Sequence, residues 1–131
     1  MQYQNAVSVK PEYKAIMMQT ASISGYSTII IKKKFPNHHI HIIPDPLNID
    51  KGLMEIRLKE LTVTFVVNQQ DICSTGYLFL NKMSELKKYL TVCKKYFESL
   101  TPNSWRYKNC CIELLKEGTD YYFLFYAYSE L

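Results

Sequence analysis

The chain has 131 residues, and its 16 Lys and Arg residues against 12 Asp and Glu residues give a formal net charge of +4. Leu, Ile, Val and Phe make up about 28% of the chain, well above the roughly 20% below which chains tend to stay disordered. A chain of this length usually forms one domain around one core. These features exclude disorder, collagen, coiled-coil rods and disulfide miniproteins, and they predict a single globular domain over residues 1–131.

The positive charge comes almost entirely from lysine, because Arg57 and Arg106 are the only arginines. Arginine is the side chain that binds phosphate and base edges through paired hydrogen bonds. Its scarcity weakens the case for sequence-specific nucleic-acid recognition, although the lysines tolerate an anionic partner. Frequent Lys, Ile, Tyr and Asn with few Ala and Gly indicate an AT-rich genome, such as that of a low-GC bacterium, a phage or a virus.

The four cysteines, Cys73, Cys93, Cys110 and Cys111, contain no CxxC pair. The first ten residues lack the apolar segment of a signal peptide. The longest apolar run, Tyr121–Tyr128, is too short to cross a membrane. We therefore expect a cytoplasmic protein with reduced, mostly buried thiols, and with neither a membrane segment nor a cofactor.

The first part of the chain predicts a short helix followed by a β-hairpin. Residues 1–10 alternate weakly and indicate an edge strand, and Pro11 then marks the start of the helix. Residues 26–35 contain a β-branched run that predicts a strand. A turn at Pro36 would join it to a second strand at residues 38–43.

The middle of the chain reads as a loop followed by extended segments. Residues 44–52 have the composition of a loop, and residues 53–67 form the longest extended segment. Its apolar positions change face near Lys59, which predicts a β-bulge there. A polar turn at residues 68–71 and a short strand at residues 77–80 follow.

Residues 82–100 predict one long amphipathic helix. Its apolar stripe has spacings of three and four and consists of Met83, Leu86, Leu90, Cys93, Phe97 and Leu100. Asn81 or Ser84 would cap its start, and Pro102 would end it. The lysines that lie away from the stripe and face water are Lys87, Lys88, Lys94 and Lys95.

The C-terminal part of the chain predicts more strands. Residues 105–116 fit either a strand or a helix closed by Gly118. We favour the strand, because Glu117–Asp120 between two apolar runs resembles a hairpin loop. Residues 120–129 then form a strand that is apolar on both faces, which is typical of the middle of a sheet or of a subunit interface. A homodimer through this C-terminal strand is one expectation.

Together these elements predict an α+β fold: a curved, mainly antiparallel sheet of six to seven strands, with the 82–100 helix packed on it and a short N-terminal helix. The strand-then-helix order in Tyr77–Leu100 resembles the corresponding unit of the PC4, Pur and Whirly single-strand-binding proteins. That resemblance implies only a similar arrangement of secondary-structure elements, and it assigns no functional residues in this chain. The expected core consists of Ile29, Ile31, Ile56, Val63, Phe65, Leu78, Leu80, Leu86, Leu90, Phe97, Ile112, Leu114, Phe123 and Phe125.

No catalytic or metal-binding motif emerges. His38, His39 and His41 place two imidazoles on one strand face, but no further ligands follow at a diagnostic spacing. A polar strand face explains them better, and a pH sensor is the other alternative, because imidazole titrates near neutrality. Cys110 and Cys111 are better explained as buried thiols than as nucleophiles.

Two kinds of non-enzymatic binding protein remain open. The first acts stoichiometrically on a protein partner, as an immunity protein or a phage or viral inhibitor does. Aromatic residues make up 14% of the chain, and Tyr and Trp are enriched as anchors of protein interfaces. The candidate contacts are Trp105, Tyr107, Tyr122, Tyr126 and Tyr128.

The alternative is a single-stranded nucleic-acid-binding protein with a sheet-plus-helix arrangement like that of PC4 or Whirly. Such proteins stack bases on aromatic side chains and hold the phosphates with basic residues, so their affinity falls steeply with salt. The candidate residues are Lys32, Lys33, Lys34, Lys87, Lys88, Lys94 and Lys95.

Overall fold

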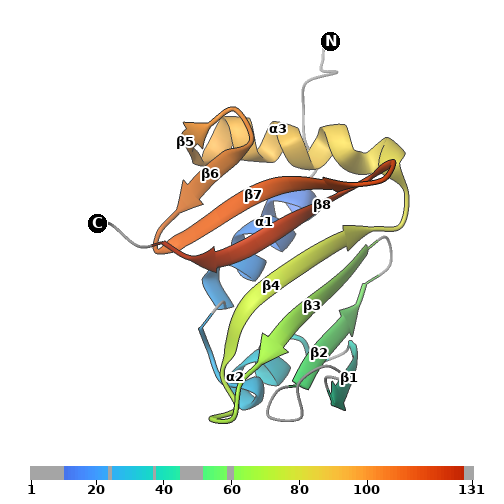
Figure 1. Cartoon of the computed structure of the whole chain (residues 1–131), viewed down its shortest axis with the longest axis vertical. Coiled ribbons are helices and arrows are strands. Elements are labelled where there is room, and N and C mark those ends of the chain that lie inside the picture. Colours follow the sequence, from blue (N-terminus) through green and yellow to red (C-terminus); the bar gives the residue numbers. More distant parts are fainter. Residues whose placement is uncertain (1–10, 24, 37, 45–51, 59–60, 129–131) are drawn as a thin grey trace.

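The computed structural model describes residues 11–23, 25–36, 38–44, 52–58 and 61–128 (Figure 1). They form one antiparallel sheet of eight strands in the order β1-β2-β3-β4-β8-β7-β6-β5. The strands are β1 (His39–Pro44), β2 (Gly52–Arg57), β3 (Leu61–Val67), β4 (Cys73–Leu80), β5 (Glu98–Thr101), β6 (Ser104–Tyr107), β7 (Cys110–Glu117) and β8 (Asp120–Ala127). The helices are α1 (Pro11–Ile23), α2 (Thr28–Lys34) and α3 (Leu86–Tyr96), the last preceded by a 3-10 turn, Met83–Glu85. The edge strand expected in residues 1–10 and most of the expected loop lie outside the described residues.

The expectation of six to seven strands and one long helix is wrong, since the sheet has eight strands and α3 ends at Tyr96. Phe97 is extended, with ψ 155°, and its buried ring lies 5.2 Å from that of Tyr107. The chain then continues as the edge strand β5, and Pro102 lies in the turn to β6. The stripe in residues 82–100 therefore spans a helix and the start of a strand.

The expected caps of this helix are also wrong. The residues at the N-cap positions are Lys82 for the 3-10 turn and Glu85 for α3, and neither side chain makes a capping hydrogen bond. Ser84 lies inside the 3-10 turn, which closes through a 3.1 Å hydrogen bond from the Glu85 N–H to the Lys82 carbonyl oxygen. This turn supplies the start that a capping side chain would otherwise stabilise.

The strand expected in residues 26–35 is helix α2. The Ser27 hydroxyl accepts a 3.4 Å hydrogen bond from the Ile30 N–H and caps the helix. Thr28, Ile31 and Phe35 recur at spacings of three and four and are buried, whereas Ile29 is 61% exposed. Burial on a helical period thus overrides the β preference of the isoleucine run.

The β-bulge expected within residues 53–67 is replaced by a hairpin. β2 and β3 pair with each other, with Met54 opposite Phe65 and Ile56 opposite Val63. The chain reverses direction between β2 and β3, which explains why the apolar positions change phase. The preference for strand in residues 105–116 is confirmed by β6 and β7, and Gly118 has φ 64° in the hairpin that joins β7 to β8.

The topology divides into two similar halves. Helices α1 and α2 precede the antiparallel meander β1–β4, and helix α3 precedes the meander β5–β8. The last strands of the two meanders, β4 and β8, pair antiparallel at the centre of the sheet. Figure 1 shows that β4 and β8 separate on both sides of this central contact.

All three helices contribute to one core on one side of the sheet, here called the helix-covered face. Met17 of α1, Ile31 of α2 and Val92 of α3 are each 0% exposed and belong to that core. Most of the expected core is confirmed, but Ile29 is exposed. Three further expected core residues are only partly buried against the core: Leu86, Leu90 and Leu114.

Candidate functional site

The opposite side of the sheet carries no helix among the described residues, and we call it the helix-free face. Cross-strand pairing defines its centre, because Tyr77 of β4 lies opposite Thr64 of β3 and Leu124 of β8. Its outward side chains on the four central strands are Thr62, Thr64, Val66, Thr75, Tyr77, Phe79, Cys111, Glu113, Leu115, Glu117, Asp120, Tyr122, Leu124 and Tyr126. Solvent-facing sides of antiparallel sheets are usually polar, so the apolar content of this face needs a reason.

Three aromatic rings form a cluster at the centre of the helix-free face. The ring centroids of Tyr77 and Phe79 lie 6.0 Å apart and nearly parallel, at 9°. The Tyr122 ring completes the cluster, 6.2 Å from Tyr77 and 5.5 Å from Phe79. Phe79 is 42% exposed. This aromatic cluster is a pre-ordered apolar surface open to contact.

A polar group borders the aromatic cluster on β7 and β8. The Tyr126 hydroxyl donates a 2.8 Å hydrogen bond to Glu113 Oε1. This bond to the carboxylate raises the pKa of Tyr126 above its usual value. Tyr126 therefore stays neutral and fixed, and it presents its ring rather than a titrating group.

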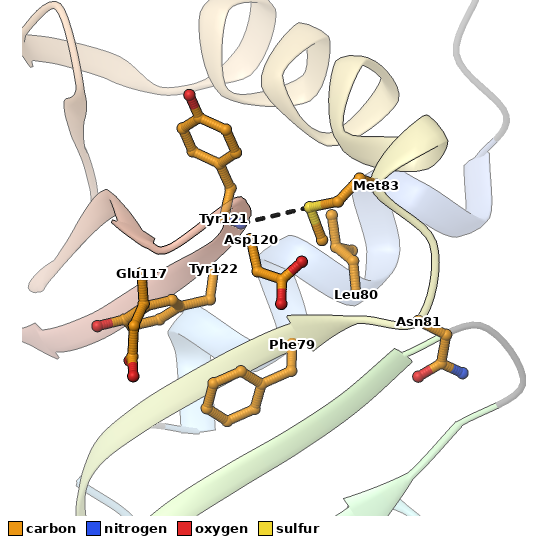
Figure 2. A pocket seen from close by; sticks show the side chains of 8 residues that line it. All are labelled: Phe79, Leu80, Asn81, Met83, Glu117, Asp120, Tyr121 and Tyr122. Atoms are coloured by element: carbon orange, nitrogen blue, oxygen red, sulfur yellow. Dashed lines mark hydrogen bonds between the residues drawn. The ribbon is translucent and has the colours of Figure 1, made fainter.

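A pocket of about 350 Å³ lies at the end of the sheet where β4 and β8 separate (Figure 2). The two strands pair only over Gly76–Phe79 and Tyr122–Phe125, so their ends part beyond Phe79. Phe79, Tyr122, Glu117 and Asp120 line the pocket on the helix-free face, while the Tyr121 side chain points away toward α3. We call this the hairpin pocket.

Lysines and arginines are distributed differently between the two sides of the sheet. The helix-free face carries no lysine among the described strand residues, but it carries Arg57 and Arg106 on the outer strands β2 and β6. Lys116 points to the other side, 5.6 Å from the Tyr121 ring. The predicted lysines lie on helices: Lys32–Lys34 end α2, and the other four lie in α3. Figure 1 places α2 and α3 at opposite ends of the molecule. The structure therefore does not bring the two lysine groups together.

The predicted aromatic contacts divide between the two faces. Tyr122 and Tyr126 lie on the helix-free face. Trp105 is 2% exposed and belongs to the core, so it is not available to a partner. Tyr107 packs on Phe97 in the helix-covered layer, and the Arg106 guanidinium lies 4.0 Å from the Tyr128 ring centroid.

Sequence reasoning missed Tyr77, Phe79, Glu117 and Asp120 as site residues. The alternation of Tyr77 and Phe79 around the buried Leu78 was a usable signal, because it places both rings on one face of a strand. Which face the helices cover is set by packing, and the alternation alone does not reveal it.

The three histidines lie in or just before the edge strand β1. His38 packs edge-on against Phe35, at 5.4 Å between ring centroids, and His39 and His41 lie in the edge strand β1. No group of three or more His, Cys, Asp or Glu residues in the described part of the chain is arranged to hold a metal ion. The side chain of His39 lies outside the described residues.

All four cysteines are unbonded and buried, which confirms the expected buried thiols. Burial raises the pKa of three of these thiols to about 12: Cys73, Cys93 and Cys110. Burial also raises the pKa of Cys111. Because the thiolate is the nucleophile, none of these cysteines is activated for catalysis.

Comparisons with known proteins give no match from which a function could be inferred. No family model, no curated protein and no solved structure matches this chain. The resemblance to PC4, Pur and Whirly proteins therefore gains no support from a solved structure. No helix in the described residues is long and apolar enough to cross a membrane. What the protein does must be argued from the helix-free face and its pocket.

Proposed function

We propose that this protein is a non-enzymatic binding module that engages a protein partner stoichiometrically through the helix-free face. The observation that carries the proposal is the aromatic cluster of Tyr77, Phe79 and Tyr122, with Leu115 and Leu124 beside it. Immunity proteins and phage or viral inhibitors act in this stoichiometric way.

Burial of exposed aromatic surface would supply the free energy of binding. Aromatic side chains remove large apolar areas from water when a partner covers them, and they dominate the hot spots of protein interfaces. The rings of the cluster are already packed on one another, so binding orders few side chains and costs little conformational entropy. A polar rim is also present, because Glu113, Glu117 and Asp120 border the cluster.

The single-stranded nucleic-acid alternative fits this geometry less well. Base stacking requires aromatic rings and basic residues along one groove. Here the aromatic cluster and the predicted lysines lie on opposite sides of the sheet, and carboxylates lie beside the rings. A strand of nucleic acid on the aromatic cluster would meet the carboxylates of β7 and β8, since the two arginines of this face, Arg57 and Arg106, lie on the outer strands β2 and β6.

A second copy of the chain is the other occupant that the test must recognise. β8 pairs with β4 on one side and with β7 on the other over Tyr122–Phe125. A homodimer through this strand would have to use its outward face, since its edges are occupied there. Such a dimer would cover the same aromatic cluster.

The test compares two double variants in affinity capture from the cells that naturally make the protein. Phe79→Ala/Tyr122→Ala removes two rings of the cluster, and Lys87→Ala/Lys94→Ala changes the exposed side of α3 as the matched control. We expect one protein to be enriched with wild type and with the lysine variant, and lost with the ring variant. Light scattering of the purified complex should give a fixed stoichiometry.

The proposal is overturned if the captured protein is kept by the ring variant and lost by the lysine variant. It is also overturned if light scattering shows that wild type alone is a dimer that Phe79→Ala/Tyr122→Ala makes monomeric. Enrichment of nucleic acid through the lysines, with no protein dependent on the rings, would favour the alternative.

A further inference from the structure

We infer that the hairpin pocket receives an arginine side chain presented by the protein partner. This inference rests on the proposed function and names the chemistry of the partner. The pocket offers two aromatic rings, Phe79 and Tyr122, whose centroids lie 5.5 Å apart at 34°. Beside them stand the carboxylates of Glu117 and Asp120 (Figure 2).

The two carboxylates differ from those of Glu55 and Glu113 on the same face, which have partners. Glu55 forms a 2.8 Å ion pair with Arg57, and Glu113 accepts the hydrogen bond from Tyr126. Neither the Glu117 nor the Asp120 carboxylate has a hydrogen-bond or ion-pair partner among the described residues. Their positions are fixed by the hairpin, in which the two residues lie opposite each other.

A guanidinium fits this combination better than other cations. It is planar, it stacks on aromatic faces, and its fork of N–H donors matches carboxylate oxygens. An ammonium is a compact and strongly hydrated charge that gains less from the rings. A metal ion is disfavoured, because the described residues place no third His, Cys, Asp or Glu ligand with Glu117 and Asp120.

Another pocket of the molecule lacks this combination of rings and carboxylates. It has a volume of about 420 Å³ and lies where β4 and β8 separate at their other ends. Lys108 lines it, and no carboxylate does. Lys108 would therefore repel an arginine at this pocket, whereas Glu117 and Asp120 would attract one at the hairpin pocket.

The test titrates the full-length, isotope-labelled protein with a blocked Gly-Arg-Gly peptide and follows backbone amide shifts by NMR. A matched Gly-citrulline-Gly peptide has nearly the same shape without the charge. We expect saturable shifts at Phe79, Glu117, Asp120 and Tyr122 with the arginine peptide. The Glu117→Gln/Asp120→Asn variant should bind it about tenfold more weakly or worse, since charge-assisted hydrogen bonds are lost.

A control variant tests whether the loss of binding is specific to the hairpin pocket. The Glu98→Gln variant changes an exposed acid on the edge strand β5 and should bind like wild type. The inference is overturned if citrulline binds as well as arginine, if the shifts fall elsewhere, or if none appear at millimolar peptide. If that happens while Phe79→Ala/Tyr122→Ala still loses the captured partner, the arginine inference fails and the proposed function stands. Arginine binding at the pocket without any ring-dependent partner would instead overturn the proposed function.

Discussion

The two faces of the central strands differ in how deeply their side chains are buried. On β8, Phe123 and Phe125 point toward the helices and are 0% exposed, while Tyr122 and Leu124, which alternate with them, are only partly buried. The same strand therefore contributes aromatic groups to the core and to the helix-free face. The difference teaches that neighbouring residues of similar chemistry serve stability on one face and contact on the other.

The largest expected difference between the two faces is in stability, and truncation of neighbouring rings on β8 tests it. We expect Phe123→Ala to lower the free energy of unfolding by about 3–5 kcal/mol, because it leaves a cavity in the core. Tyr122→Ala should cost less, about 1 kcal/mol, since its ring is only partly buried and its loss leaves no closed cavity in the core. Urea denaturation of both variants measures the two values. Equal losses would show that the helix-free face is part of the stabilising core.

Gly76 offers a second comparison across the sheet. A Cβ added to it would lie 2.8 Å from Phe65 Cε1 and 3.1 Å from Phe65 Cδ1. Phe65 is 0% exposed, so its ring has little room to move. We expect Gly76→Ala to destabilise the protein by about 1–3 kcal/mol through overpacking.

The matched control for Gly76 is its neighbour Thr75, which points to the helix-free face. Thr75→Ala should change the free energy of unfolding by less than about 1 kcal/mol, the span of strand preferences in a host protein. Thermal or urea unfolding provides the comparison. A Gly76→Ala variant as stable as Thr75→Ala would mean that the core on this side yields more than its packing implies.

How much of the fold the sequence predicted depended on whether local and tertiary preferences agreed. The sequence predicted the alternating burial of β3, seen in Val63 and Phe65, and the hairpin at Gly118. At these positions the local backbone preference and the tertiary packing favour the same structure. The sequence did not predict helix α2, because its isoleucines favour a strand. The burial of Ile31 and the hydrogen bond between Thr28 and Asp71 stabilise the helix instead. That 2.6 Å hydrogen bond joins residues far apart in the sequence.

The candidate site was predicted only in part for the same reason. Tyr122 and Tyr126 were named from aromatic enrichment, but Trp105 was named on the same ground and is buried. Residue type indicates interface propensity, whereas exposure depends on which face the helices cover. Glu117 and Asp120 carried a turn signal in the sequence, and only the separation of β4 from β8 makes them part of a pocket.

The adjacent cysteines of β7 test the comparison chemically. Cys110 points into the core and is 3% exposed, while Cys111 points to the helix-free face beside Tyr126 and is 7% exposed. We expect iodoacetamide to modify Cys111 first, although slowly, because burial raises the pKa of both thiols. Mass spectrometry of the native protein gives the order, and all four cysteines should react in urea.

Tyr126→Ala sharpens this experiment, because it removes the ring beside Cys111 and leaves the core side unchanged. Alkylation of Cys111 should become faster, and that of Cys110 should stay slow. Equal acceleration of both thiols would point to general loosening of the sheet and would remove the distinction between the two faces at this position.

The smallest expected effect lies within the helix layer, where a polar contact joins α1 to the start of α3. Tyr13 donates a 3.1 Å hydrogen bond to Glu85 Oε1, and Lys88 Nζ lies 2.8 Å from Glu85 Oε2. The hydrogen bond from Lys88, followed by that from Tyr13, lowers the pKa of Glu85 below its usual value. The pKa of Lys88 is raised, first by the same bond to Glu85.

These two shifts predict a pH window for the contact. A lowered carboxyl pKa stabilises the fold above the unfolded pKa of about 4.3, and this contribution is lost as the pH falls through the folded value. A raised lysine pKa stabilises it below about 10.4, and that contribution is lost as the pH rises through the folded value. The free-energy difference between wild type and Glu85→Gln should therefore be largest between about pH 5 and pH 10 and narrow on both sides. Urea denaturation across this range measures it, and a difference that persists unchanged at about pH 3 would show that the contact acts through shape rather than charge.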